Sequence, residues 1–138
     1  HICFYSDKEK IIFTGDTLFS LGCGRVFEGT YSEMLQSLKK IKDLPKDTNI
    51  YCGHEYTKKN LDFCKKVEID NNLLKEKKKW LDLRINKRIP TLPITLGEEL
   101  DTNIFLRCDV VSVKKSLGME HSSELEIFKK LRDLKDTF

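Results

Sequence analysis

The sequence predicts an α/β fold, with short strands and one helix over residues 1–56 and helices alone over residues 57–138. Two apolar runs rich in β-branched residues, at residues 11–13 and 50–52, are each closed by a glycine, as is typical of buried strands. Between them, Thr30 and Glu33 fit a capping box that begins a helix. Strand, helix and strand in this order indicate two parallel strands connected by a helix, as in α/β proteins.

The first strands are expected at residues 2–5 and 11–13, around a polar turn. The helix after Thr30 has an apolar face, and Pro45 ends its connection to a strand at residues 49–52. That face consists of Met34, Leu35, Leu38 and Ile41. The chain has no initiating Met and opens directly on an apolar strand, so we expect it to be truncated.

The pattern after residue 56 is helical. Leu61, Cys64 and Val67 share one face of a first helix, and residues 70–72 offer caps for a second. The lysine-rich run at residues 75–79 is expected on the solvated face of this second helix. Its apolar side consists of Leu73, Leu74, Trp80 and Leu81.

Two signals organise the rest of the chain. Residues 90–93 must be extended, because each proline restricts the residue before it, and Thr95 with Glu98 fits another capping box. The last helix begins near Ser122 or Ser123 and is expected to bury Leu125, Phe128 and Leu131.

Composition narrows the class of protein. The 138 residues are 39% hydrophobic, which is enough for a core. The net charge is only +3, and positive and negative residues are interspersed along the chain. Most of the positive residues are lysines, so a nucleic-acid partner is not expected. Without an apolar run near the roughly 18 residues of a bilayer span, no membrane partner is expected either. The five cysteines show no CxxC spacing and indicate a reducing compartment, hence a cytoplasmic protein, with an organellar form left open.

Asp16 and His54 are the candidate metal ligands, because each follows a strand and a glycine. The alternative for Asp16 is a turn or helix N-cap residue, because Asp after Gly is common at both. A carboxylate can bridge two cations while a histidine supplies a neutral nitrogen, and paired metals generate hydroxide near neutral pH. Even one catalytic zinc usually takes three protein ligands, so this pair is only part of a site.

Other candidates carry weaker signals. The turn at residues 22–25 either binds an anion, through backbone N–H groups and Arg25, or is a plain loop. Arg132 and Lys135 share a helix face and, by pattern alone, are surface cations. Cys23 lacks a partnering base, which argues against a nucleophile. The remaining histidines, His1 and His121, lie in no ligand-like spacing.

The motifs GDTLFSLGCGRVFEGT (residues 15–30) and YCGHEYT (residues 51–57) together resemble the second half of glyoxalase II, the hydroxyacylglutathione hydrolase of the metallo-β-lactamase superfamily. The resemblance continues through residues 90–99, residues 103–107 and the terminal KDTF. It implies the carboxyl-terminal half of a metallo-β-lactamase αββα sandwich over residues 1–56. An all-helical glutathione-binding domain is implied over residues 57–138.

The resemblance also implies an activity. The family hydrolyses the thioester of S-D-lactoylglutathione to glutathione and D-lactate with two divalent metal ions, zinc, iron or manganese, and a bridging hydroxide. The metals polarise the thioester carbonyl, hydroxide attacks, and a metal stabilises the oxyanion. By motif, Asp16 matches the aspartate that bridges both metals and His54 a histidine that binds one of them.

Four further residues match glutathione contacts of the family. Arg25 is at the basic position of GCG(K/R) and Tyr56 is the tyrosine of HEYT. Arg132 and Lys135 match the two cations that receive the glycine carboxylate. Phe27 stands where the family often has Tyr, which implies the loss of one hydroxyl contact.

The family's HxHxDH motif and the ligand histidine of its HTxGH segment are not in this chain, and His1 matches the second, non-ligand His of that segment. We therefore expect no thioester turnover by this chain alone, and a missing amino-terminal half as its partner. The alternative is a catalytically inactive glutathione-binding remnant. The related persulfide dioxygenases typically read AHDY rather than GHEY, and a nucleic-acid module would interleave aromatics with cations.

Overall fold

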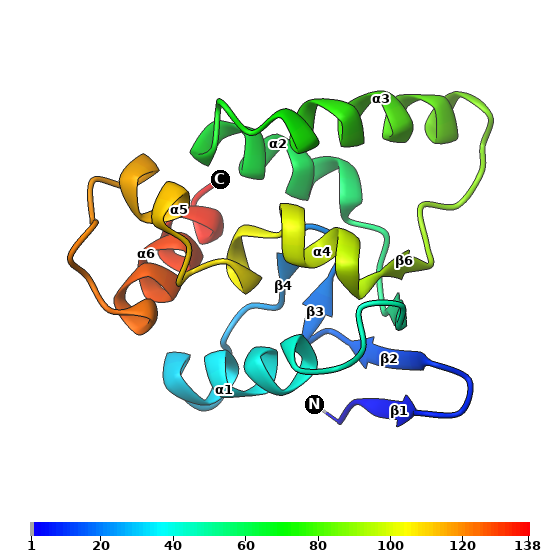
Figure 1. Ribbon diagram of the computed structural model, residues 1–138, viewed down its shortest axis with the longest axis horizontal. Coiled ribbons are helices and arrows are strands. Elements are labelled where there is room, and N and C mark those ends of the chain that lie inside the picture. Colours follow the sequence, from blue (N-terminus) through cyan, green and yellow to red (C-terminus); the bar gives the residue numbers. More distant parts are fainter. Residues whose placement is uncertain (1) are drawn as a thin grey trace.

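The computed structural model describes residues 2–138, so the expectation for His1 lies outside the described residues. A four-stranded sheet in the order β1-β2-β5-β6 lies beside a larger group of helices (Figure 1). Its strands are β1 (Phe4–Ser6), β2 (Ile11–Gly15), β5 (Asn49–Cys52) and β6 (Ile94–Thr95). β2 and β5 are parallel, as expected, and the two outer pairs are antiparallel. A separate hairpin pairs β3 (Leu18–Phe19) with β4 (Gly22–Cys23).

Local signals in the sequence set the first residues of four helices. The capping boxes at Thr30 and Thr95 are both formed, Asn71 caps the second helix of the helical part, and Ser123 caps the last helix. Each cap supplies hydrogen bonds to N–H groups that a helix leaves free in its first turn. The helices are α1 (Tyr31–Lys42), α2 (Thr57–Val67), α3 (Asn72–Asn86), α4 (Leu96–Thr102), the 3₁₀ helix η1 (Ile104–Leu106), α5 (Val111–Ser116) and α6 (Glu124–Asp136).

The expectation of helices alone after residue 56 is wrong at β6. Ile94 and Thr95 pair with Ile50 and Asn49 and add an antiparallel edge strand to the sheet. The prolines keep this segment extended, and the free edge of β5 supplies partners for its backbone groups. The helical part therefore contributes a strand to the sheet.

The buried faces of two helices, α3 and α6, differ from the expected ones. Leu73 and Leu125 are 46% and 39% exposed, because they lie on the flanks of the buried stripes of α3 and α6. Ile127 and Arg132 are buried on α6 instead. The lysine run is not wholly solvated, since Lys77 is buried with its Nζ 3.2 Å from Glu98 Oε1.

The sheet is buried on one face only. Ile12, Ile50 and Ile94 belong to one hydrophobic core that also contains side chains of the helices, including Leu61 of α2. Successive side chains of a strand point to opposite faces, and Phe13 is 54% exposed, so the expectation of a wholly buried β2 is wrong. No helix within residues 2–138 has the length and apolar character needed to cross a membrane.

Candidate functional site

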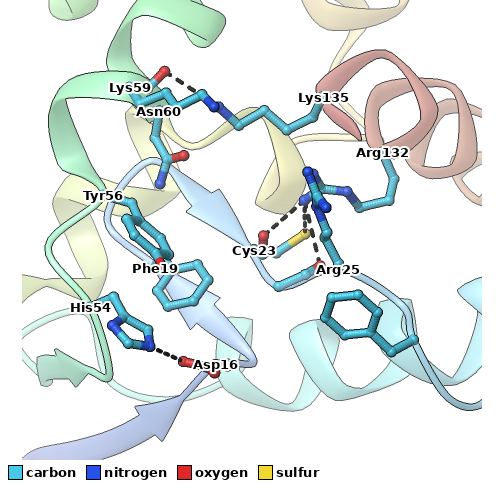
Figure 2. A pocket seen from close by; sticks show the side chains of 12 residues that line it. Asp16, Phe19, Cys23, Arg25, His54, Tyr56, Lys59, Asn60, Arg132 and Lys135 are labelled. Atoms are coloured by element: carbon cyan, nitrogen blue, oxygen red, sulfur yellow. Dashed lines mark hydrogen bonds and ion pairs between the residues drawn. The ribbon is translucent and has the colours of Figure 1, made fainter. Parts of the chain in front are cut away.

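One cavity of about 440 Å³ is lined by all six of the site residues expected from the sequence. Figure 2 shows Asp16 and His54 near each other, with Tyr56 beside them, and Arg25, Arg132 and Lys135 farther along. These residues follow β2, β4 and β5, with Tyr56 directly before α2, or belong to α6. We call this cavity the pocket. The fold thus assembles residues that lie up to 119 positions apart in the sequence, Asp16 and Lys135.

Asp16 and His54 face each other at the carboxyl ends of two parallel strands. His54 Nε2 lies 3.5 Å from Asp16 Oδ1. Glycines allow this approach, since a Cβ on Gly53 would lie 2.7 Å from Asp16 Oδ1 and one on Gly24 would lie 1.9 Å from the Asp16 carbonyl oxygen. The same strand ends are joined by a hydrogen bond from Gly53 N–H to the Gly15 carbonyl, at 2.8 Å.

The chemistry of this pair suits a divalent transition metal, because carboxylate oxygen and imidazole nitrogen are both common ligands. Both side chains are accessible, at 40% exposed for Asp16 and 53% for His54. Within residues 2–138 no group of three or more His, Cys, Asp or Glu side chains is placed to hold an ion. Two donors are fewer than the three protein ligands of a typical catalytic zinc, so the pair fits part of a metal site and not a complete one.

Aromatic packing orients the His54 ring. It stacks on Tyr56 with ring centroids 5.0 Å apart and an angle of 17° between the planes. Phe19 of β3 packs edge-on against Tyr56 at 5.1 Å. The three rings form one cluster at the end of the pocket that contains Asp16 (Figure 2).

Thr91 anchors the segment that connects β5 to α2. Its backbone N–H and hydroxyl donate to the Glu55 carboxylate at 3.2–3.3 Å, and its hydroxyl shares a 2.8 Å hydrogen bond with that of Thr57. The segment between α3 and β6 therefore helps to hold the loop that carries His54 and Tyr56.

Lys135 is a pocket cation that contacts two aromatic rings and a backbone carbonyl. Its Nζ lies 5.1 Å from the ring centroid of Phe63 and 5.0 Å from that of Phe138. It donates to the Lys59 carbonyl at 3.3 Å, and within residues 2–138 no ion pair joins it to a carboxylate. Burial against these rings lowers the pKa of Lys135 to about 8. A carboxylate that entered the pocket would find a partly desolvated ammonium group that makes no ion pair in the described part of the chain.

Arg132 is not the surface cation that its pattern indicated, because it is only 3% exposed. Its Nε and Nη2 donate to Asp136 Oδ1 at 3.0 and 2.8 Å, and its Nη1 donates to the Cys23 carbonyl at 2.8 Å. The guanidinium also lies 5.3 Å from the ring centroid of Phe105. Arg132 thus joins α6 to the glycine-rich turn while it lines the pocket.

Of the two alternatives for the glycine-rich turn at residues 22–25, the contacts do not favour an anion site built from backbone N–H groups. The Gly24 N–H donates to the Thr17 carbonyl at 3.2 Å, whereas the carbonyls of Cys23 and Gly24 accept from Arg132. The turn therefore directs carbonyl oxygens toward the arginine. Arg25 is 56% exposed and its Nε lies 3.4 Å from Asp136 Oδ1.

The electrostatic balance of the pocket is positive. Arg25, Lys59, Arg132 and Lys135 line it, against the single carboxylate of Asp16. The remaining reactive group, the Cys23 thiol, has its pKa raised to about 11 by burial. It is protonated at neutral pH, which agrees with the expectation that it is not a nucleophile.

Sequence reasoning missed three pocket residues, Phe19, Lys59 and Asn60. Helical spacing could have identified two of them, because Lys59 and Asn60 follow Tyr56 by three and four positions at the start of α2. Phe19 offered no such signal, since its position depends on the β3–β4 hairpin.

Comparison with known proteins covers the whole chain. A family model described as "Hydroxyacylglutathione hydrolase C-terminus" matches residues 55–138. The metallo-β-lactamase superfamily model matches residues 1–54. These matches agree with a mixed α/β chain in which a short sheet region precedes a helical domain, so the expected fold class is confirmed.

Curated relatives carry the name hydroxyacylglutathione hydrolase. One from Pelagibacter ubique (strain HTCC1062) is 55% identical over 138 residues, which are all of this chain and 52% of the relative. Another, from Chelativorans sp. (strain BNC1), is 49% identical over 138 residues, all of this chain and 54% of the relative. A third, from Bartonella quintana (strain Toulouse), is 46% identical over 137 residues, 99% of this chain and 54% of the relative. The chain spans about half the length of the curated relatives it matches.

The family model matches more than half of the chain, and the residues before it match the metallo-β-lactamase superfamily. The chain therefore belongs to the hydroxyacylglutathione hydrolase family.

Proposed function

We propose that this chain is the substrate-binding half of a hydrolase that cleaves hydroxyacylglutathione thioesters, S-D-lactoylglutathione in the first place, to glutathione and D-lactate. The single observation that carries the proposal is the pocket, which has an Asp–His pair at one end and cationic side chains farther along. One of these cations, Lys135, forms no ion pair with a carboxylate within residues 2–138. In this proposal residues 1–56 are a partial metallo-β-lactamase domain and residues 57–138 bind the substrate.

The chemistry of glutathione fits the pocket. It is an elongated tripeptide with a carboxylate near each end, and the pocket has excess positive charge. Lys135 is the proposed receptor of the glycine carboxylate, because its ammonium group is partly desolvated and, among the described residues 2–138, forms no ion pair with a carboxylate. Arg25 and the Tyr56 hydroxyl are proposed as further contacts along the peptide. Arg132 supports these contacts mainly by its hydrogen bonds to Asp136 and to the glycine-rich turn.

The acyl end of the substrate would then lie toward Asp16 and His54. We propose these two side chains as ligands of a dinuclear site of zinc, iron or manganese, which would supply hydroxide and polarise the thioester carbonyl. The chain contributes to that site by fixing Asp16 between Gly24 and Gly53 and by stacking His54 on Tyr56. Since further ligands are needed, we expect this chain alone to bind glutathione and not to hydrolyse its thioesters.

The partner proposed to complete the site is an amino-terminal half, corresponding to the part of the relatives that this chain does not match. The open face of the sheet supports this choice. Ile2, Phe4 and Phe13 are 77%, 69% and 54% exposed, and the Phe13 ring lies 5.5 Å from that of Tyr51. Exposed aromatic side chains in one patch typically mark a covered surface. This patch lies on β1 and β2, and Asp16 directly follows β2.

The first test is calorimetric binding of glutathione to the chain. We expect Lys135→Ala to weaken binding about tenfold, as loss of one charge-assisted contact does. Lys130→Ala, an exposed lysine on the same helix, is the matched control and should bind like the wild type. If glutathione does not bind, or if both variants bind equally well, the pocket assignment fails.

The second test separates a working half-enzyme from an inactive remnant. The residues of the Pelagibacter ubique relative that lie outside the match would be co-expressed with this chain, and zinc-loaded protein assayed for loss of S-D-lactoylglutathione. If this chain is half of a working enzyme, the co-expressed polypeptides should hydrolyse the thioester. The substitution Asp16→Asn in this chain should then abolish hydrolysis. Glutathione binding without any restored hydrolysis would favour the inactive, glutathione-binding alternative.

A further inference from the structure

The turn between β3 and β4 has an unusual backbone. Phe19 pairs with Gly22, so that Ser20 and Leu21 form a two-residue turn. Leu21 has a φ of +60° and its side chain is wholly buried. The left-handed conformation costs a residue with a Cβ roughly 1–2 kcal/mol, so surrounding contacts must hold it.

Side chains of the helical part supply those contacts. Glu99 of α4 accepts a hydrogen bond from the Leu21 N–H at 2.8 Å and one from Asn103 Nδ2 at 2.8 Å, both at its Oε2. Asn103 Nδ2 also lies 3.1 Å from the Gly22 carbonyl. Asn60 of α2 donates to the Ser20 carbonyl at 2.9 Å. The tip of the hairpin is therefore bound to residues about 40 to 80 positions away in the sequence.

The hairpin reaches both parts of the pocket. Phe19 on β3 packs against Tyr56 and His54, and the Cys23 carbonyl on β4 receives Arg132. We propose that Glu99 is a positioning residue, which holds the β3–β4 turn and through it the pocket walls formed by Phe19 and Cys23. The functional part of this inference rests on the proposed glutathione pocket.

Geometry, and not charge, is what the turn requires of Glu99. Both 2.8 Å hydrogen bonds end on Oε2, while Oε1 lies 3.4 Å from the Ser20 hydroxyl. A glutamine could place its carbonyl oxygen where Oε2 lies and its amide NH₂ where Oε1 lies. A leucine has a similar volume but accepts no hydrogen bond, and it would leave the N–H of Leu21 and the amide of Asn103 without this acceptor.

The test compares Glu99→Gln with Glu99→Leu, and Asp101→Asn, an exposed carboxylate on the same helix, is the control. The readout is iodoacetamide labelling of Cys23, which is 5% exposed, resolved by mass spectrometry from the wholly buried Cys108. We expect Glu99→Leu to label at Cys23 at least about tenfold faster, with Cys108 still protected, as local opening does. Glu99→Gln and Asp101→Asn should label like the wild type.

Glutathione binding is the second readout. Glu99→Leu should lose about tenfold in affinity, since displaced pocket walls misplace the ligand contacts, and Glu99→Gln should retain wild-type affinity. Unchanged Cys23 labelling in Glu99→Leu, or parallel labelling of Cys108, would overturn the positioning role. If Glu99→Leu does not fold, Glu99→Gln decides the question. A tenfold change in its Cys23 labelling rate would then overturn the positioning role. Absence of glutathione binding by the wild type would reject the proposed function, while Cys23 labelling would still decide what holds the turn.

Discussion

If the pocket binds glutathione as proposed, Lys135 should make that binding depend on pH in a range where most lysines stay charged. On the proposal that this ammonium receives the glycine carboxylate, only its protonated form binds well. The pKa of Lys135 is lowered to about 8, chiefly by burial against Phe63 and Phe138. Affinity should therefore be full well below pH 8 and fall as the pH rises through 8.

The magnitude follows from the fraction protonated. With a pKa near 8, about ten in eleven Lys135 side chains are charged at pH 7 and about one in eleven at pH 9. Glutathione affinity should fall up to about tenfold over this range. Calorimetry with S-methylglutathione measures the effect without interference from the thiol of the ligand.

The matched variant is Lys135→Arg, because a guanidinium stays charged throughout this range. Titration of the ligand amino group affects both proteins equally, so the difference between their pH profiles isolates Lys135. If the variant loses as much affinity as the wild type between pH 7 and 9, Lys135 is not the carboxylate receptor.

Two predictions concern stability. Burial raises the pKa of Glu99 to about 7, above its usual 4.5, so the folded state retains a proton that the unfolded state loses. The stability of the wild type relative to Glu99→Gln should therefore fall as pH rises from 4.5 to 7, by up to about 3 kcal/mol in urea denaturation, and parallel profiles would refute this. Gly24→Ala would place a Cβ 1.9 Å from the Asp16 carbonyl oxygen, and should lower the stability by at least about 2 kcal/mol. An unchanged melting temperature in that variant would show that the two segments can separate at no cost.

Elements governed by near neighbours in the chain could be predicted from the sequence. Thr30 and Thr95 begin helices because each bonds with a Glu three residues later, and residues 49–52 form a strand as expected. The site residues carried by motifs, Asp16 and His54 among them, line one pocket in the structure.

Features that depend on distant segments could not be predicted in this way. The two residues of β6 carry no periodic signal, and they form a strand because the edge of β5 is free. Arg132 has the pattern of a surface cation and is buried because its partners Cys23 and Gly24 lie on another element.

The sequence by itself determined where α1, α3, α4 and α6 begin, and which residue types stand at the ends of β2 and β5, because capping, turn formation and periodicity act over a few residues. Only the tertiary structure decided which pocket cations form ion pairs with carboxylates, which carboxylate is buried, and which side chains hold the β3–β4 turn. These properties depend on desolvation and on hydrogen bonds between segments far apart in the chain, such as that from Leu21 to Glu99.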